Sequence, residues 1–278
     1  MMTVLRVELS KVFSKWRTFI GFIAIGVLVP IVIIAMGLEG NTYFSFATQV
    51  LRQQFDFAGN LMNGYTVAYI IQGMLYIHVP FLVTLVSGDI LAGEATAGTY
   101  RLIFTRPVRR STVVTAKWLA SMLYTVLLVL WMAILSMGIG IPFLGTGELV
   151  VIRSTITIIA VDDVLWRFLA GYGYAALAMM TVASIAFLFS SLVENAIGPI
   201  MTTMAIIIVF TIISAIDVPL FDYIRPALFT NHMNGWRYLF DDPVNWSKLI
   251  TSASVLVAHI AACFTATMII LKRKDILT

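Results

Sequence analysis

Long apolar runs alternate with short polar segments along the chain, and this pattern predicts six membrane-spanning helices. A helix that crosses about 30 Å of hydrocarbon needs about 20 predominantly apolar residues. The predicted spans are residues 18–37, 62–87, 113–143, 165–190, 196–215 and 247–271. The segments between them are too short for a soluble domain. We therefore expect an all-α polytopic membrane protein whose single domain covers residues 1–278.

The composition supports this class of protein. Of the 278 residues, 60% are hydrophobic and only 12% are charged, whereas an ordinary soluble domain carries about 25% charged residues. Too little polar surface remains to cover a water-soluble globule of this size. The single cysteine, Cys263, lies inside an apolar run, so no intramolecular disulfide can form.

The basic residues predict the orientation in the membrane. With the N-terminus in the cytoplasm, most of the 18 Lys and Arg residues fall on cytoplasmic segments, as the positive-inside rule requires. An even number of spans then returns the C-terminus to the cytoplasm. The net charge of +4 is mainly a topology signal, and we expect no nucleic-acid partner.

Residues 3–17 predict an amphipathic helix before the first span. Its apolar residues fall on one helical stripe, and basic and hydroxyl residues cover most of the opposite side. The stripe consists of Leu5, Leu9, Val12, Phe13 and Trp16. Such a helix lies in the headgroup plane of the membrane, with its cations toward anionic lipids. Two interpretations stay open: a simple basic anchor, or an elbow helix that also contacts a cytoplasmic partner.

A charged segment, residues 88–111, separates the second and third predicted spans. It contains "DILAGEAT", which predicts a short helix, and the pattern breaks near Gly98. Thr99 is a candidate cap for a further turn, and Pro107 ends regular structure. A loop that only sets topology explains the arginines of this segment well. It explains Glu94, the break at Gly98 and the stop at Pro107 poorly.

This segment, "GEATAGTYRLIFTRPVRRSTVVTAKWLA", resembles the loop of ABC-2-type permeases, the membrane subunits of one class of ABC exporters. Their pattern is E-x-x-x-G-T, a short helix with an arginine, P-x-x-R, and a lysine that enters the next span. The matching positions are Glu94, Gly98, Thr99, Arg101, Pro107, Arg110 and Lys117. The basic amphipathic start, the six spans and the ending "MIILKRKDIL" also resemble the family, although Leu271 replaces its usual aromatic residue.

The resemblance implies the permease subunit of an ATP-driven exporter. Its loop would be a coupling helix seated in a cleft of a separate ABC ATPase, present in two copies, which binds ATP and Mg²⁺. Two permease chains, identical or similar, would form a dimer around a central path. The family also implies the plasma membrane of a prokaryote, which is the inner membrane in a Gram-negative cell. The chain contains no G-x-x-x-x-G-K-[ST] phosphate loop, so we expect neither an enzyme nor a cofactor in this chain itself.

Two tyrosines are candidates for the translocation path. Tyr172 and Tyr174 lie in "GYGYAALA", within the fourth predicted span. Gly171 and Ala175 have the small-xxx-small spacing that lets helices approach closely. Plain helix packing therefore explains the same stretch.

Few ionisable side chains lie in the predicted spans, where a charge at the centre costs at least about 2.5–3.5 kcal/mol. Arg167 and Lys117 are expected at span edges, where their long side chains reach water. His78 and His259 fit either a hydrogen bond to a neighbouring helix or a relay or metal pair. The lack of a charged relay argues against a secondary transporter.

Residues 216–246 are predicted to be an external loop, rich in the aromatic rings that are typical of membrane interfaces. In the family that the chain resembles, this loop often dips back as short helices that close the outer mouth. We expect the same here.

Two other functions stay open. A polytopic membrane enzyme would need clustered acids or metal ligands, and the only acid pairs are Asp162–Asp163 and Asp241–Asp242, without metal-ligand companions. A non-transporting scaffold or mechanotransmitter that binds an ATPase would share the same loop. The sequence does not define a substrate.

Overall fold

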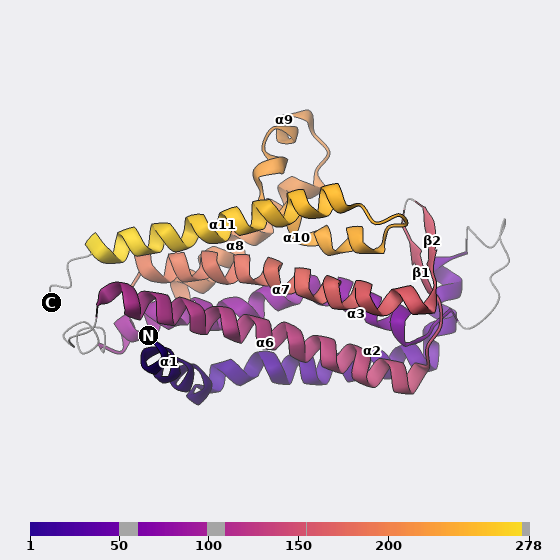
Figure 1. The fold of residues 1–278 in the computed structure, drawn as a ribbon, viewed down its shortest axis with the longest axis horizontal. Coiled ribbons are helices and arrows are strands. Elements are labelled where there is room, and N and C mark those ends of the chain that lie inside the picture. Colours follow the sequence, from indigo (N-terminus) through magenta and orange to yellow (C-terminus); the bar gives the residue numbers. More distant parts are fainter. Residues whose placement is uncertain (50–60, 99–108, 154, 274–278) are drawn as a thin grey trace.

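The computed structural model describes residues 1–49, 61–98, 109–153 and 155–273, which form an elongated helical bundle (Figure 1). Its longer helices are α1 (Met2–Ser14), α2 (Trp16–Ala47), α3 (Gly64–Ser87), α4 (Asp89–Thr96), α6 (Arg110–Leu144), α7 (Val161–Leu192), α8 (Ile197–Ala215) and α11 (Trp246–Arg273). Its shorter elements are β1 (Leu149–Ile152), β2 (Ile156–Ile159), α9 (Pro219–Asp222), η2 (Arg225–Ala227), α10 (Phe229–Met233) and η3 (Asn234–Phe240).

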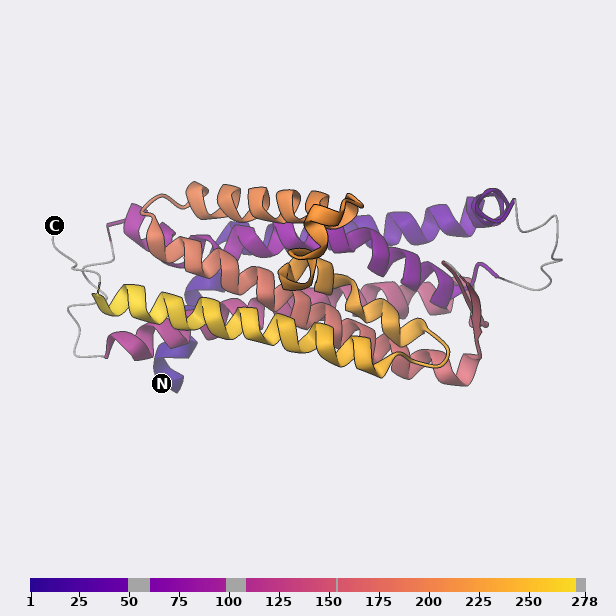
Figure 2. The same cartoon turned by 90° about the horizontal axis from the view of Figure 1, so that it is seen from above.

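Six helical segments within the described residues are long and apolar enough to cross a membrane, which confirms the predicted number of spans. They are α2, the stretch Tyr76–Thr96 made by the end of α3 with α4, and the helices α6, α7, α8 and α11. The boundaries differ most for the second span, which was predicted at residues 62–87 and is found at Tyr76–Thr96. Helix α2 also continues to Ala47, beyond the predicted end of the first span. The start of α1 and the end of α11 lie at the same end of the bundle (Figures 1 and 2).

A β-hairpin that the sequence did not predict lies at the opposite end of the otherwise helical bundle (Figure 1). The strands β1 and β2 pair antiparallel, with Leu149 opposite Ile159 and Ile152 opposite Ile156. Both strands are rich in β-branched residues, which favour a pleated, half-buried surface. The two strands together are too short to span a membrane as a helix. Leu149 and Ile159 bury their side chains against the bundle.

Helix α7 is the centre of the bundle and packs against α3, α4, α6, α8, α11 and the short helices α10 and η3. Large and small side chains alternate in its buried face, including Phe168, Ala178, Val182 and Phe187, none of which is exposed. Gly171 lies where an added Cβ would touch Gln72 of α3 and Phe240 of η3. Close packing of this helix therefore depends on its small residues.

The predicted amphipathic helix is divided in two. Helix α1 ends at Ser14, Lys15 has an extended backbone, and Trp16 begins α2. The hydroxyl of Thr18 donates to the backbone carbonyl of Val12 and holds this turn. The stripe residues of α1 pack on the bundle, namely Leu5, Leu9, Val12 and Phe13. Trp16 instead points outward and is 73% exposed, because the turn rotates it away from the stripe.

The segment after α8 consists of four short helices. In Figure 1, α9 protrudes from the side of the bundle, whereas α10 and η3 pack against α7 and α11. Figure 2 shows that α8 covers only part of the length covered by α11. Phe229, Trp236 and Phe240 are buried, and Tyr223 between α9 and η2 is 90% exposed. That these helices close an outer mouth stays a prediction.

Candidate functional site

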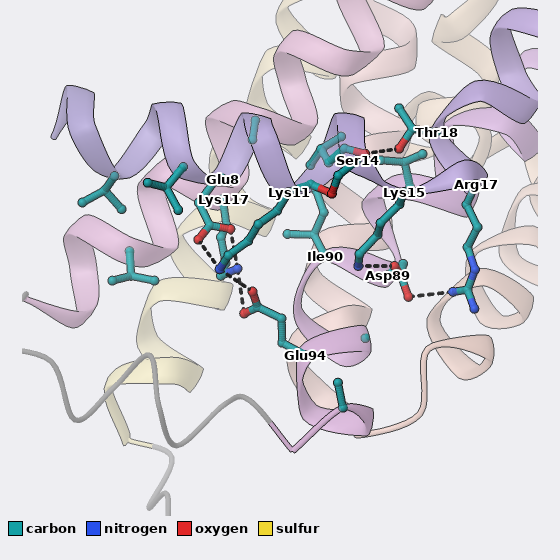
Figure 3. Close-up of a pocket in the computed structure, with 18 of the residues that line it drawn as sticks. Glu8, Lys11, Ser14, Lys15, Arg17, Thr18, Asp89, Ile90, Glu94 and Lys117 are labelled. Atoms are coloured by element: carbon teal, nitrogen blue, oxygen red, sulfur yellow. Dashed lines mark hydrogen bonds and ion pairs between the residues drawn. The ribbon is translucent and has the colours of Figure 1, made fainter.

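A cavity of about 530 Å³ lies at the end of the bundle that carries α1. It is enclosed by α1, the start of α2, the end of α3, the short helix α4, and α6 (Figure 3). Most of its surface is apolar. Seven charged side chains also line it: Glu8, Lys11, Lys15, Arg17, Asp89, Glu94 and Lys117. They form two groups.

The first group is a closed ring of two acids and two bases (Figure 3). Lys117 Nζ lies 2.6 Å from Glu8 Oε2 and 2.7 Å from Glu94 Oε2. Lys11 Nζ lies 2.9 Å from Glu8 Oε1 and 3.0 Å from Glu94 Oε1. We call these four residues the ion-pair ring. It joins α1, α4 and α6, and its formal charge is zero.

Lys117 corrects the expectation that its side chain reaches water from the edge of a span. The side chain is only 1% exposed, and its ammonium group is enclosed by the two carboxylates. A buried ion pair has to offset a large desolvation cost, so losing one partner leaves a costly unpaired charge. The ring therefore fixes the relative positions of three helices.

The ring also shifts the pKa values of its two α1 members. Burial alone would raise the pKa of Glu8, but the ammonium groups of Lys117 and Lys11 together hold that pKa below its usual value. Burial alone would lower the pKa of Lys11, but Glu8 and Glu94 together raise it. Both shifts favour the charged forms of Glu8 and Lys11.

The second group joins α4 to the turn between α1 and α2. Asp89 accepts from Lys15 Nζ at 2.7 Å and from Arg17 Nη1 at 2.8 Å. The Asp89 carboxylate is buried, whereas both cations are about half exposed. We call these three residues the Asp89 group. It carries one net positive charge.

Helix α4 is the predicted short helix "DILAGEAT", which the structure confirms. The first N–H groups of a helix lack intrahelical partners. In α4, the hydroxyl of Ser190 on α7 accepts from the N–H groups of Leu91 and Ala92, at 3.1 and 2.9 Å. At its other end, Thr96 Oγ1 donates to the carbonyl of Glu194 at 2.7 Å. Helix α4 is therefore anchored to α7 as well as to α1 and α6.

The predicted ATPase-coupling residues divide between the described and the undescribed parts of the chain. Gly98 follows α4 with φ of +66°, a left-handed conformation that glycine adopts without steric cost. Arg110 begins α6 and is exposed. Thr99, Arg101 and Pro107 lie outside the described residues.

The coupling role that the resemblance implies for Glu94 stays a prediction. Ion pairs with a partner ATPase would fit that role. In the structure, both carboxylate oxygens face lysines of the same chain, Lys11 and Lys117. The structure thus makes Glu94 a link between helices of this protein.

The two candidate path tyrosines are buried in the bundle. The hydroxyls of Tyr172 and Ser136 lie 2.5 Å apart and share a hydrogen bond. Tyr174 donates to the carbonyl of His232 at 2.7 Å and so fixes α10 to α7. Within this chain both rings join helices, and their place along a translocation path stays a prediction.

The hydrogen bonds that the structure gives His78 and His259 are to their own helices and not to a neighbouring helix. Nδ1 of His78 lies 3.0 Å from the carbonyl of Met74, and Nδ1 of His259 lies 2.8 Å from that of Val255. Each partner lies one turn earlier in the same helix. In the part of the chain that the structure describes, no group of three or more His, Cys, Asp or Glu side chains is placed to hold a metal ion.

Arg167 is likewise not an edge residue that reaches water. It donates to Asp163 Oδ2 at 2.8 Å, and to the carbonyls of Leu239 and Asp241 at 3.0 and 2.7 Å. Its side chain is 6% exposed. The guanidinium therefore fastens the end of η3 to α7.

Glu8 and Asp89 were not predicted to be site residues. The local signal for Glu8 was weak: it is the only acid in the basic helix α1 and borders the stripe of Leu5, Leu9 and Val12. Nothing local indicates that its partner is Lys117, which is 109 residues away in the sequence.

The fold and this site define a multi-pass membrane protein in which the short helix α4 is tied to α1, to the start of the first span and to the third span. Residues 2–276 match the profile of the ABC-2 family transporter protein, and the chain belongs to that family. By family it is thus an ABC-2-type permease.

The chain is also similar to the uncharacterized protein YhcI of Bacillus subtilis (strain 168), with 25% identity over 204 residues. The matched region covers 70% of this chain and 64% of that relative, so the chain spans less than two thirds of the relative's length.

Proposed function

We propose that this chain forms the translocation path of an ATP-driven exporter and receives its energy through α4 from a separate ABC ATPase. The observation that carries the proposal is the attachment of α4: ion pairs hold it to α1 and α6, and hydrogen bonds hold it to α7. Membership of the ABC-2 family supports an ATPase partner in general.

The attachments make α4 suited to transmitting movement. A force on α4 reaches Lys117 of α6 through Glu94, and reaches the turn before α2 through Asp89. Packed elements with a few discrete arrangements shift as rigid bodies instead of deforming gradually. Displacement of α4 would therefore move the first, third and fourth spans together.

The contact with the ATPase is assigned to the exposed side of this element. Thr96, Ala97 and Gly98 are exposed at the end of α4, and the arginine-bearing stretch of the family motif follows them. In this proposal Arg101 pairs with acids of the ATPase through charge-assisted hydrogen bonds. Thr99, Pro107 and Arg110 belong to the same family motif in the sequence. ATP and Mg²⁺ bind to the ATPase and not to this chain.

The proposed assembly holds two permease chains and two ATPase subunits. The segment that carries α9 supports a second permease copy, because Leu220 and Tyr223 are exposed on a part that protrudes from the bundle (Figure 1). Asp217 and Asp222, on the same segment, pair with Arg225. Charged, irregular backbone at membrane depth is tolerated where it is covered by protein or lines a water-filled cavity. A second chain beside this segment would provide that environment.

Co-purification with a candidate ABC ATPase tests the coupling assignment. The substitution Arg101→Glu is expected to reduce the recovered ATPase at least about tenfold. It replaces a charge that attracts acidic residues of the ATPase with a charge that repels them. The matched control is Arg273→Glu, which reverses a charge at the same end of the bundle, on α11. Full recovery of the ATPase with Arg101→Glu would overturn the assignment.

Transport itself is tested in proteoliposomes that contain both subunits. An exporter shows ATP hydrolysis that rises with its transported solute, and accumulation of that solute on the side away from the ATPase. Hydrolysis that drives no movement of any solute would instead assign the chain to a force-transmitting scaffold.

A further inference from the structure

The cavity beside α1 has the composition of a site for an amphiphile. Its volume of about 530 Å³ lies within the range of about 300–1,000 Å³ that is typical of small-molecule and cofactor sites. The apolar lining comes from four helices and includes Val12, Leu85, Val86, Ile90 and Val113. These side chains offer no hydrogen-bonding groups, so the inner part of the cavity suits a hydrocarbon chain.

The two charged groups that line the cavity differ in net charge. The four residues of the ion-pair ring neutralise one another. In the Asp89 group, one carboxylate faces two cations, Lys15 and Arg17. The single excess positive charge therefore lies with these two side chains, which are 46% and 56% exposed. An anionic group that approaches from the solvent meets this excess charge at the edge of an apolar cavity.

The surroundings indicate where the ligand comes from. Val7 on α1 lines the cavity and is also exposed. Trp16, beside Lys15 and Arg17, points outward from the start of the first span. Tryptophan is enriched at the level of lipid headgroups. The cavity therefore lies at the depth where a headgroup, and not only a soluble anion, is available.

From the apolar lining and the excess charge beside it, we infer that this cavity binds one anionic phospholipid, with an acyl chain between α1 and α3–α6 and its phosphate at Lys15 and Arg17. Binding of this lipid differs from the general attraction of a basic helix to an anionic membrane. Lys11 on α1 turns inward to Glu94, and Lys15 and Arg17 after α1 turn inward to Asp89 (Figure 3). The inference does not depend on the proposed transport function.

Native mass spectrometry of the full-length chain in detergent tests the inference. Phosphatidylglycerol is the anionic probe, and phosphatidylcholine, which is zwitterionic with no net charge, is the comparison. We expect one retained phosphatidylglycerol per chain and weaker retention of phosphatidylcholine. Arg17→Gln removes the excess charge and leaves Lys15 to pair with Asp89. It should weaken phosphatidylglycerol binding about fivefold, the effect of about one basic residue on attraction to anionic lipid.

The matched control is Arg6→Gln, which makes the same charge change on α1 at an exposed residue outside the cavity lining. It should change binding less than twofold. A second variant, Val113→Phe, fills the cavity and keeps every charge, and should also reduce retention. Thermal unfolding of each variant in detergent verifies that it is folded.

Three results would overturn the inference. Equal weakening by Arg6→Gln and Arg17→Gln would show only general electrostatic attraction. Displacement of the lipid by inorganic phosphate at equal concentration would assign the cations to a soluble anion. Equal retention of both lipids by the unmodified chain would show that the excess positive charge does not select the lipid. This measurement uses no variant, so it does not depend on whether a variant folds.

Discussion

The two ends of the bundle use buried charges in different ways. At the end with α1, the ion-pair ring links side chains of three helices through four ion pairs. At the end with the β-hairpin, Arg167 binds the i−4 residue Asp163 and two backbone carbonyls of the η3 end. The first arrangement depends on the positions of separate helices, and the second fastens a loop to one helix.

This difference bears on function. Ion pairs between helices are bonds that a change in helix position can break and remake, as is common in conformational switches. An arginine that binds backbone carbonyls keeps a loop in one place. The contacts at the end with α1 therefore suit a region whose helices change position, and those at the opposite end suit a region that does not. Four predictions test this contrast.

The largest expected effect is that of Lys117→Met. It leaves Glu8 and Glu94 buried with Lys11 as their only remaining lysine, and breaking a buried ion pair in this way costs about 3–5 kcal/mol. Chemical unfolding in detergent should show this loss, whereas the exposed control Lys272→Met should lie within about 0.5 kcal/mol of the unmodified chain. The double variant Lys117→Met with Glu94→Gln should recover part of the loss. No recovery would show that the two residues act independently.

The next largest effect is expected from Arg167→Met. It leaves the carbonyls of Leu239 and Asp241 without their donor, and an unsatisfied buried polar group costs about 1–3 kcal/mol. Hydrogen exchange should accelerate in η3 and remain unchanged in α1 and α4. The exposed Lys248→Met serves as the control on the same end. Faster exchange at both ends would contradict the separation of the two regions.

Acidification should destabilise the ion-pair ring by less than either of these two substitutions. The folded-state pKa of Glu8 lies below its ordinary value of 4.5, so its pairing contributes stability that is present above pH 4.5 and is lost as pH falls through the lower folded value. The pKa of Lys11 lies above its ordinary value of 10.5, so its contribution is present below pH 10.5 and is lost as pH rises through the higher folded value.

Between these limits, the attachment of α1 should not vary with pH. Distances between spin labels on α1 and α6, measured from pH 3 to pH 7, should broaden only at the acidic end. In Glu8→Gln, part of that acid dependence should disappear. Broadening near pH 7 in the unmodified chain would contradict this prediction.

The smallest effect is expected from Lys15→Gln. Half-exposed ion pairs contribute about 0.2–1 kcal/mol, and Arg17 continues to pair with Asp89. The loss of unfolding free energy should therefore stay below about 1 kcal/mol. A loss as large as that of Lys117→Met would show that the Asp89 group, and not the ring, holds α4.

Several features of the fold could be predicted because their signals are local. The apolar runs predicted six spans, the pattern of residues 89–96 predicted α4, and the residues around Glu94 and Gly98 predicted the ABC-2 family. The β-hairpin and the division of the first helix at Lys15 were missed. Both depend on a few residues whose packing against the bundle outweighs their local preferences.

The candidate site was only partly predictable for a different reason. Glu94 was recognised as important, but its ion pairs within this chain were not predicted. Lys117 and Arg167 were placed in water, because a single long basic side chain near a span edge usually reaches it. Lys117 pairs with Glu8 and Glu94, and Arg167 donates to the carbonyls of Leu239 and Asp241. A pattern of neighbouring residues does not reveal these distant partners.

The sequence by itself determined the class, the spans and the family of this protein, because hydrophobicity and motif spacing act over short stretches of chain. Only the tertiary structure decided which charges meet. Glu8 and Lys117 are 109 residues apart, and Lys11 and Glu94 are 83 apart. An ion pair forms only where packing brings its two partners together and excludes water, and that packing is a property of the whole bundle.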